Sequence, residues 1–473
     1  MTEAELEAIA ELKSIVGSED TLLDGPNLNN YKKDMADFEA TPLVVVRPRS
    51  EEQIPQIVNI ANKYNLKIVP WGAGTSLTGA VVLEGGVVID MHYLNKILKV
   101  DPVNWNVLVQ PGMVLDDLNK ELKKSGFFFP PDPASSFACT VGGAVSEGSG
   151  GMRCVKYGTM KDWVLALKVV LPNGKMTWLG EPLPKNRAGY NLVHLFVGSE
   201  GSLGIVIQAY LKIIPLPTVP VRRLVVLFDD WASASKAIVA FRTSRIVPTI
   251  MEFMDRENVV AVNQAFQTKW DEAEATLLVD IDEPNIEKAS QIFRDSGARK
   301  ITIAKDEKEA EELYQARAQA LVALKSISTG TRPEDVVVPI DKLVEYLDLV
   351  RRVASKYKLK IPVVGHAGDG NVHPVILFDR NDAASTRAAE TAFEEICRYA
   401  IEVGGTITGE HGVGSEKAKL LVEQLTAHGG EEALRLMKMI KRGIDPNDLM
   451  NPGKYVDLDY DGHASSASPG AEG

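Results

Sequence analysis

The sequence predicts an α+β protein built from two domains, and three observations support this class. The chain has 473 residues, whereas single hydrophobic cores stop growing at about 250–300 residues. In its first half, short apolar runs typical of strands alternate with glycine-rich loops rather than with regular long helices. A proline-rich stretch, Pro215 to Pro220, interrupts the chain near its middle and is the best candidate for a domain boundary.

The N-terminal half begins with a helix and continues with strands. Residues 3–16 place Leu6, Ile9, Leu12 and Ile15 at helical spacing, which predicts an amphipathic helix within an N-terminal segment over residues 1–40. From Thr41 the pattern becomes β-α-β and defines a first domain over residues 41–217. The predicted elements are strands at 43–46, 66–70, 87–90, 107–110, 166–171 and 204–213, and a helix at 51–64.

The C-terminal half predicts a second α+β domain over residues 218–440. We expect residues 441–457, which contain the loop Asp445 to Gly453, to return to the first domain. Residues 458–473 are rich in glycine, serine and alanine and predict a disordered tail. The elements expected in the second domain are strands at 224–228 and 276–280 and helices at 231–242, 285–296 and 431–440.

Composition and charge exclude several classes of partner. A net charge of -12 argues against nucleic acid and against a basic membrane-binding surface. No apolar run approaches the ~18–20 residues that span a bilayer, and the N-terminus is acidic. The three cysteines are too few for an iron–sulfur cluster or a disulfide framework. We therefore expect a cytoplasmic protein.

Three glycine-rich loops in the first domain are candidates for a dinucleotide site. The first, residues 70–79, follows a predicted strand, and its backbone N–H groups can cradle a pyrophosphate. It is not a Rossmann fingerprint, because Leu77 replaces the third glycine, and not a P-loop, because Ala80 replaces the lysine. Taken alone, this loop is equally well explained as an ordinary turn. Two further loops, at 130–151 and 197–206, favour an extended ligand.

The three loops resemble those of the flavoproteins related to vanillyl-alcohol oxidase and p-cresol methylhydroxylase, over about residues 41–217. The resemblance implies a p-cresol methylhydroxylase-type FAD-binding domain followed by a C-terminal α+β substrate, or cap, domain. The first loop would hold the pyrophosphate, the second the isoalloxazine and ribityl, and the third the adenosine side. The implied FAD contacts are Pro70, Gly72, Ala73, Gly74, Thr75, Ser76, Gly79, Pro131, Asp132, Pro133, Thr140, Gly142, Gly143, Ser146, Gly150, Gly201, Ile205 and Val206.

The resemblance also bears on how FAD is attached. Some relatives bind it covalently through a histidine at the position that corresponds to Thr75. Because threonine offers no such bond, we expect noncovalent FAD.

Three of the seven histidines lie in two glycine-rich segments of the second domain. Residues 361–377 predict strand, glycine turn and strand, which would place His366 and His373 opposite each other. Residues 404–414 predict a strand end that offers Glu410 beside His411. Two imidazoles and a carboxylate suit Zn, Mn or Fe and leave positions open for substrate oxygens. A structural role is the commoner interpretation for a lone histidine.

These segments resemble the C-terminal domain of FAD-linked D-lactate dehydrogenases, glycolate oxidase catalytic subunits and D-2-hydroxyglutarate dehydrogenases, so that the likeness covers about residues 41–455. The resemblance implies that His366, His373 and Glu410 bind a divalent metal and that His411 is the general base. Near a bound cation the charged form of His411 is disfavoured, so that it can act as a base near neutral pH.

The same resemblance supplies a cation for the substrate carboxylate. It implies that Arg317 grips the carboxylate bidentately, with a solvated helix arginine as the alternative and Arg332 as a weaker candidate. Asn451 is expected to return to the flavin domain as a further FAD contact, and a plain turn is an equal interpretation. Leu321 and Val375 are apolar where relatives that act on 2-hydroxyglutarate have polar groups, which favours a small acid.

The expected reaction is oxidation of a small D-2-hydroxy acid to the 2-oxo acid, with hydride transfer to flavin N5. D-lactate is favoured, with glycolate and D-2-hydroxyglutarate as alternatives. No motif identifies the electron acceptor, which is expected to be a quinone, a cytochrome or an electron-transfer flavoprotein. The sequence leaves the oligomeric state open, with a homodimer and a subunit of a larger complex as the two alternatives.

Two other functions compete with this one. An enzyme resembling alkyl-dihydroxyacetonephosphate synthase would share the architecture but perform a non-redox exchange. A noncatalytic FAD-binding subunit of a glycolate oxidase-like complex is expected to have lost catalytic groups. The joint presence of His366, His373, Glu410 and His411 argues against both.

Overall fold

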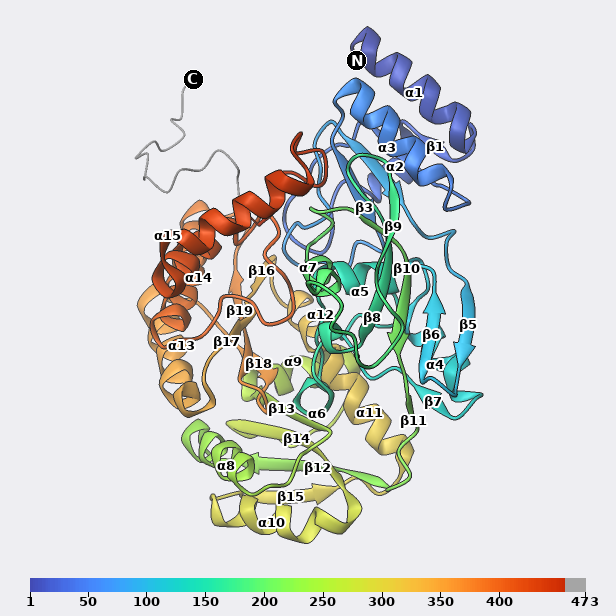
Figure 1. Cartoon of the computed structure of the whole chain (residues 1–473). Helices are drawn as coiled ribbons and strands as arrows, with labels where there is room; N and C mark the ends of the chain where they lie inside the picture. The colour runs from blue at the N-terminus through green and yellow to red at the C-terminus, as the bar shows by residue number, and fades with distance from the viewer. Residues whose placement is uncertain (456–473) are drawn as a thin grey trace.

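Four β-sheets organise the chain in this computed structural model, which describes residues 1–455 (Figure 1). Strands β1 to β11 form sheets of four, five and two strands, and β12 to β19 form one sheet of eight. The change from one group to the other falls between Pro215 and Val221, within the proline-rich stretch. The tail expected over residues 458–473 lies outside the described residues.

The four-stranded sheet has the order β1-β2-β4-β3; strands β2, β4 and β3 are parallel, and β1 pairs antiparallel with β2. Strands β2 and β4 are buried along their whole length, as expected for parallel strands covered on both faces. Helix α1 packs on this sheet and on α3 through Ala8, Ile9, Leu12 and Val16, whereas Leu6 is exposed, contrary to its predicted place on the buried face. The elements are α1 (Glu3–Val16), β1 (Thr21–Leu22), α2 (Gly25–Asn29), β2 (Val44–Val46), α3 (Gln53–Tyr64), β3 (Ile68–Trp71) and β4 (Val87–Asp90).

The five-stranded sheet is antiparallel, with the order β5-β6-β10-β8-β9, and β7 pairs separately with β11. Short helices, rather than long crossovers, connect its strands, in agreement with the glycine-rich loops of the sequence. The elements are β5 (Ile97–Asp101), β6 (Asn106–Val109), α4 (Leu115–Lys123), β7 (Phe127–Phe128), α5 (Val141–Glu147), α6 (Cys154–Tyr157), β8 (Val164–Val170), β9 (Met176–Gly180), α7 (Leu192–Phe196), β10 (Ile205–Lys212) and β11 (Ile214–Pro215).

The eight-stranded sheet is antiparallel along β15-β12-β14-β13-β18-β19-β16, and β17 also pairs with β19. One apolar cluster joins one face of this sheet to α8, α10, α13, α14 and α15, and a second joins the other face to α9, α11 and α12. The strands are β12 (Val221–Phe228), β13 (Ile250–Asp255), β14 (Ala275–Asp282), β15 (Lys300–Ile303), β16 (Gly330–Pro333), β17 (Val336–Val337), β18 (Val363–His366) and β19 (Asn371–Phe378).

The helices of this half cover both faces of the sheet. Their bounds are α8 (Trp231–Thr243), α9 (Arg256–Phe266), α10 (Ile286–Asp295), α11 (Glu307–Ala318), α12 (Ala320–Lys325), α13 (Leu343–Tyr357), α14 (Ala383–Glu402) and α15 (Ala418–Ile444).

The helix predicted at 431–440 is part of the longer α15. Gly430 interrupts that helix with φ 69° and ψ -179°, so the predicted segment is the part that follows the interruption. Glycine adopts this backbone conformation at little cost.

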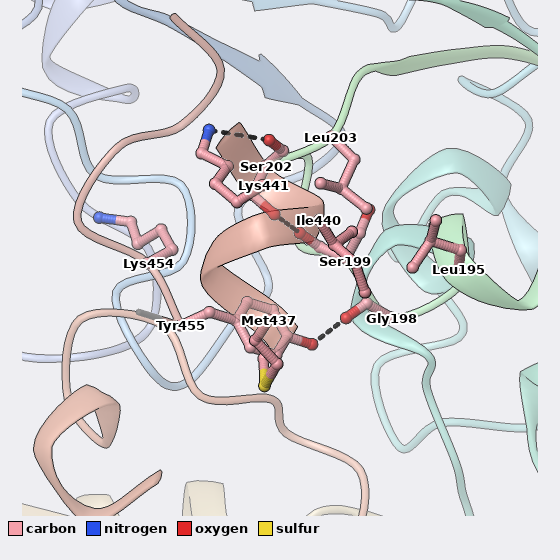
Figure 2. A pocket seen from close by; sticks show the side chains of 10 residues that line it. All are labelled: Leu195, Gly198, Ser199, Ser202, Leu203, Met437, Ile440, Lys441, Lys454 and Tyr455. Atoms are coloured by element: carbon pink, nitrogen blue, oxygen red, sulfur yellow. Dashed lines mark hydrogen bonds between the residues drawn. The ribbon is translucent and has the colours of Figure 1, made fainter. Parts of the chain in front are cut away.

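After α15 the chain returns to the four-stranded sheet. The backbone N–H of Asn451 donates to the carbonyl of Ile68 at 2.7 Å, and Leu449 and Met450 are buried against that sheet. Near this junction a pocket is lined by residues of α15, of the 195–203 segment and of the closing segment (Figure 2). There Lys441 donates to the carbonyl of Ser202, and the Tyr455 hydroxyl donates to the carbonyl of Gly198. These contacts attach both α15 and the closing segment to the first half of the chain.

Candidate active site

Parts of all three glycine-rich loops surround one cavity in the first half of the chain. Of the residues implied as FAD contacts, those that line it are Pro70, Gly72, Thr140, Gly142, Gly143, Ser146, Gly201 and Val206. The other lining residues, which are not among the implied contacts, are Trp71, Val81, Met91, Pro111, Glu147 and Glu200; Trp71, Glu147 and Glu200 lie within the three predicted loops. Segments far apart in sequence thus converge on one cavity.

Close backbone approach shapes this cavity. A Cβ atom added to Gly72 would lie 2.5 Å from Oγ1 of Thr140, and one added to Gly142 would lie 2.6 Å from Cβ of Pro111. Thr140 caps α5 by accepting a hydrogen bond from the N–H of Gly143. Only glycine fits at residues 72 and 142 without displacing these neighbours, which is the property needed where backbone must approach a dinucleotide.

Glu147 presents a carboxyl group to this cavity. Its Oε2 has no hydrogen-bond partner among the described residues. Burial raises the pKa of Glu147 well above its usual range, and the neighbouring Glu200 raises it further. A neutral carboxyl is compatible with an anionic dinucleotide beside it, so the cavity fits the implied FAD.

Three implied FAD residues outside the lining have structural contacts. Asp132 accepts hydrogen bonds from the Tyr314 hydroxyl of α11 at 2.8 Å and from the Arg153 N–H at 3.0 Å. Asn451 donates through Nδ2 to the carbonyls of Ala80 and Glu200, which joins the closing segment to two glycine loops. A Cβ on Gly150 would lie 2.7 Å from Oε2 of Glu410, so the second loop reaches the histidine cluster.

The remaining implied FAD residues, none of which lines the cavity, are Ala73, Gly74, Thr75, Ser76, Gly79, Pro131, Pro133 and Ile205.

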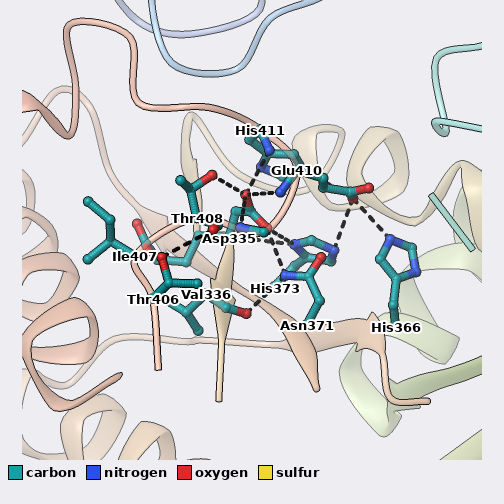
Figure 3. A network of polar contacts seen from close by, with 12 residues as sticks. Asp335, Val336, His366, Asn371, His373, Thr406, Ile407, Thr408, Glu410 and His411 are labelled. Atoms are coloured by element: carbon teal, nitrogen blue, oxygen red, sulfur yellow. Dashed lines mark hydrogen bonds and ion pairs between the residues drawn. The ribbon is translucent and has the colours of Figure 1, made fainter. Parts of the chain in front are cut away.

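The histidine cluster lies on the sheet face that α9, α11 and α12 cover. Figure 3 shows His366, His373, Glu410 and His411 gathered there. Strands β18 and β19 pair as predicted, but in a different register: His366 lies opposite Asn371, and His373 opposite Val364. The two histidines are therefore diagonal neighbours on one face, with ring centroids 5.0 Å apart. The direct pairing predicted from the sequence was wrong, although the proximity is as expected.

Glu252 of β13 is part of the same face. Strands β13 and β18 are antiparallel, and Phe253 pairs with Gly365. The preceding residue of β13, Glu252, therefore lies beside the following residue of β18, His366. Oε1 of Glu252 lies 2.8 Å from Nδ1 of His366, and Glu252 is fully buried. A charged residue inside the apolar strand Ile250–Asp255 was the sequence signal for this role, and sequence reasoning missed it.

Glu410 and His411 come from a loop, not from the predicted strand end. Around them only Thr406 makes an isolated β-bridge, to Val337. Asp335 holds the loop: its Oδ2 accepts hydrogen bonds from the backbone N–H groups of Gly409, Glu410 and His411 (Figure 3). The sequence showed Asp335 before an apolar run but gave no reason to assign it a role.

The donor atoms of His366, His373 and Glu410 form a set that fits a divalent cation. Nε2 of His366 and Nε2 of His373 lie 3.0 and 3.4 Å from Oε1 of Glu410. Nδ1 of each ring contacts a protein oxygen instead, of Glu252 and of the Glu334 carbonyl, respectively. An oxygen that accepts the Nδ1–H proton of a histidine fixes the tautomer in which Nε2 carries no proton and can bind a metal.

The electrostatics of the cluster agree with this arrangement. Burial and the neighbouring histidines lower the pKa of His373 to about 3, so its ring is neutral. Although burial opposes ionisation, His366 helps to lower the pKa of Glu410 to about 2. Burial likewise opposes the charged form of His366, but Glu252 and Glu410 raise its pKa well above the usual range. A cation at Nε2 would replace this proton.

A second combination of potential ligands, Asp335 with His373 and His411, is also compact. It is less suited to a metal because Oδ2 of Asp335 accepts four hydrogen bonds, and its Oδ1 accepts one from Asn371. The rings of His373 and His411 stack at 5.0 Å, which places His411 beside the set rather than within it.

Arg317 of α11 is buried, with 5% of its surface exposed, so the alternative of a solvated helix arginine was wrong. Its Nη2 lies 2.6 Å from Oε2 of Glu252, and its Nε has no hydrogen-bond partner among the described residues. By contrast, Arg332 forms an ion pair with Glu416 at 3.1 Å and lies over the ring of Phe393. Arg317 thus retains donors for a carboxylate.

Comparison with known proteins agrees with this architecture. Residues 42–180 match the family model described as FAD binding domain, and residues 220–455 match FAD linked oxidases, C-terminal domain. The structure of p-cresol methylhydroxylase with substrate bound is similar in fold, with a TM-score of 0.80, 20% identity and coverage of 98% of this chain and 99% of that one. The predicted two-domain flavoprotein fold is confirmed. The chain is a member of the class of FAD-linked oxidoreductases.

The relatives narrow this class. Glycolate oxidase subunit GlcD of Bacillus subtilis (strain 168) is 37% identical over 430 residues, which are 89% of this chain and 90% of that protein. D-lactate dehydrogenase of Anaerostipes hadrus is 33% identical over 465 residues, 95% of this chain and 97% of that protein. The chain belongs to the FAD-linked oxidase family that contains these glycolate oxidase subunits and D-lactate dehydrogenases.

A similar fold also occurs in alkyldihydroxyacetonephosphate synthase, with a TM-score of 0.73, 20% identity and coverage of 95% of this chain and 85% of that one. At this identity the likeness concerns the fold alone. Within residues 1–455, no helix is long and apolar enough to cross a membrane.

Proposed function

We propose that this chain oxidises a small D-2-hydroxy acid, with D-lactate favoured, to the corresponding 2-oxo acid. The observation that supports this most directly is the series Arg317, Glu252, His366 and Glu410. Successive members are in contact at 2.6, 2.8 and 3.0 Å. A donor for a carboxylate and a donor set for a metal are thereby fixed at short distance from each other, as an α-hydroxy carboxylate requires.

The residues of the chain have distinct tasks in this proposal. When bound, FAD supplies the hydride acceptor, and a divalent metal supplies a Lewis acid that acidifies the substrate hydroxyl. Arg317 binds the substrate carboxylate and orients Cα–H. His366, His373 and Glu410 would hold the metal, either Zn, Mn or Fe.

His411 accepts the hydroxyl proton at a ring nitrogen. Its Nε2 lies 3.7 Å from Oε1 of Glu410, and its side chain is 18% exposed, so it is beside the donor set and accessible. The His411 backbone is held by Asp335 at 2.7 Å, which fixes where the ring can reach. Position and access are the requirements of a general base.

Apolar packing around Arg317 supports a small substrate. Val375 is buried and Leu321 partly buried in the apolar cluster that contains Ala316, beside Arg317. A second carboxylate placed against these side chains would lose hydration without gaining a partner. This favours D-lactate or glycolate over D-2-hydroxyglutarate.

The test is anaerobic reduction of the purified, FAD-loaded chain by D-lactate, L-lactate, glycolate and D-2-hydroxyglutarate. Loss of flavin absorbance is followed in protein loaded with Zn²⁺ or Mn²⁺ and in protein treated with a chelator. We expect fast reduction by one small D-acid, abolished by chelation and restored by metal.

Each other outcome has a defined meaning. Fast reduction by D-2-hydroxyglutarate alone would contradict the preference for a small substrate. A reduction rate that does not change on chelation would contradict the role of the metal. If flavin binds but none of the four acids reduces it, a noncatalytic subunit or a non-redox enzyme would replace the proposal.

A further inference from the structure

The loop that bears Glu410 and His411 is held on one side by a carboxylate of its own domain. Oδ2 of Asp335 accepts the backbone N–H groups of Gly409, Glu410 and His411 at 2.9, 2.9 and 2.7 Å. It also accepts the Thr408 hydroxyl at 2.6 Å. Asp335 is fully buried, so these charge-assisted hydrogen bonds are shielded from water.

The same loop is held on its other side by a carboxylate of the first half of the chain. The backbone N–H groups of Val413 and Gly414 donate to Oε1 and Oε2 of Glu200 at 2.6 and 2.8 Å. Glu200 is buried, has φ 50°, and lines the cavity together with Gly201. This contact therefore crosses from the glycine-loop cavity to the histidine cluster.

The loop fits closely between these two carboxylates. Gly412 has φ 83°, and a Cβ there would lie 2.6 Å from carboxylate oxygens of both Glu147 and Glu200. Gly414 has φ 52°, and its Cβ would lie 2.2 Å from the carbonyl oxygen of Thr78. A side chain at either residue would meet these atoms, so the backbone itself lies against Glu147, Glu200 and Thr78, and Glu200 accepts two of its N–H groups.

We propose that Asp335 and Glu200 are two positioning residues with separable tasks, an inference that rests on the proposed function. Asp335 fixes Glu410 within the metal set and the backbone of His411 beside it. Glu200 sets the distance between this loop and the FAD cavity. Neither residue is assigned a contact with substrate.

An amide in place of Asp335 cannot satisfy the same partners. Oδ2 accepts four donors, and Oδ1 accepts Nδ2 of Asn371 at 2.7 Å. In Asp335→Asn, either orientation of the amide turns its NH₂ group toward another N–H donor, so one side of the network is lost. Outer-shell changes of this kind typically weaken metal binding by about 10–100-fold.

The first experiment uses the FAD-loaded, Zn²⁺-loaded full chain and its Asp335→Asn variant. We expect faster amide hydrogen exchange in peptides covering residues 404–416, with unchanged exchange in β12 and β14. Zn²⁺ should transfer to a competing chelator with an apparent affinity at least about tenfold weaker. Asp382→Asn is the matched control, because Asp382 accepts two backbone N–H groups at the start of α14, away from the site.

The second experiment uses Glu200→Gln in the same loaded protein. We expect faster exchange in the 404–416 peptides, unchanged Zn²⁺ affinity and FAD content, and a flavin-reduction rate at least about tenfold lower at saturating substrate. The substrate concentration for half-maximal rate should not change, because Arg317 lies on a different element.

The two ideas fail in different ways. If no acid reduces the flavin of the wild type, the proposed function is contradicted. Amide exchange and Zn²⁺ affinity still test the positioning roles of Asp335 and Glu200, because neither measurement depends on flavin reduction. Asp335→Asn with wild-type exchange and Zn²⁺ affinity would overturn the role of Asp335. Glu200→Gln that loses Zn²⁺ as readily as Asp335→Asn would overturn the separation of tasks.

Discussion

Oε2 of Glu252 lies 2.6 Å from Nη2 of Arg317, while Oε1 of the same carboxylate lies 2.8 Å from Nδ1 of His366. Glu252 is fully buried, so both contacts occur at low dielectric. One carboxylate thereby fixes the orientation of the residue proposed to bind the substrate and of a ligand proposed to bind the metal.

Glu252→Gln should therefore impair metal binding and substrate binding together. The amide cannot accept hydrogen bonds from both Arg317 and His366. We therefore expect metal affinity to fall by about 10–100-fold and the substrate concentration for half-maximal flavin reduction to rise. Metal content after dialysis and the substrate dependence of flavin reduction measure the two effects. A variant that changes only one of them would show that Glu252 serves a single partner.

Arg317→Lys keeps the positive charge but loses the planar fork that matches a carboxylate. We expect the substrate concentration for half-maximal flavin reduction to rise at least about tenfold, since a charged hydrogen bond contributes about 1.5–3 kcal/mol. Stopped-flow reduction over a range of D-lactate concentrations provides the measurement. Arg332→Lys is the control, because Arg332 is already paired with Glu416; equal effects in both variants would contradict the assignment.

His411→Ala should lower the rate of flavin reduction by about 10²–10⁴-fold, the usual contribution of a general base. FAD absorbance and bound metal are expected to stay at wild-type levels, because the ring of His411 lies outside the metal set. The exposed His194, on α7, offers a control substitution, His194→Ala. Near-normal reduction in His411→Ala would remove this residue from the proton-transfer step.

Gly72→Ala should reduce FAD retention. Its Cβ would come within 2.5 Å of Oγ1 of Thr140, so either the cap of α5 or the Gly72 loop must move. The flavin-to-protein ratio after gel filtration reports the loss. Gly443→Ala is the control, since no atom lies within 4 Å of the added Cβ; full FAD retention in Gly72→Ala would contradict the close backbone approach.

Asp132 should make stability depend on pH. Burial raises its pKa from 3.8 to about 6, so the folded protein holds this proton more tightly than the unfolded chain. The contribution of Asp132 is therefore greatest below pH 4 and is lost as pH rises through about 6. A shift of this size corresponds to roughly 3 kcal/mol.

Asp132→Asn removes this titration, whereas the other groups titrate in both proteins. We therefore expect the melting temperature of the wild type, relative to that of Asp132→Asn, to decrease between pH 4 and pH 7. Thermal melting at half-unit steps of pH tests this. Parallel curves would show that Asp132 is already ionised throughout.

The strands of the first half were predictable because each combines a local apolar run with glycine or proline at its ends. The predicted strands at 43–46, 66–70, 87–90 and 166–171 overlap β2, β3, β4 and β8. In the second half, β13, which bears Glu252, and α11, which bears Arg317, were not predicted, nor were α12, α13 and α14. In α13 the helical spacing of Leu343, Tyr346, Leu347, Val350 and Val353 was missed, whereas α11 is rich in charged residues and buries only Ala316 and Arg317.

The sequence by itself determined the chemistry that is available: glycine loops that admit a dinucleotide, and His366, His373, Glu410 and His411 as a potential metal and base set. The tertiary structure decided which atoms meet. Strand pairing sets the diagonal register of His366 and His373 and brings Glu252 to His366. The loop with Glu410 and His411 is held by residues distant in sequence: Asp335 is 75 positions from Glu410, and Glu200 is 213 positions from Val413. Such pairings follow from packing of the whole chain, which no local pattern specifies.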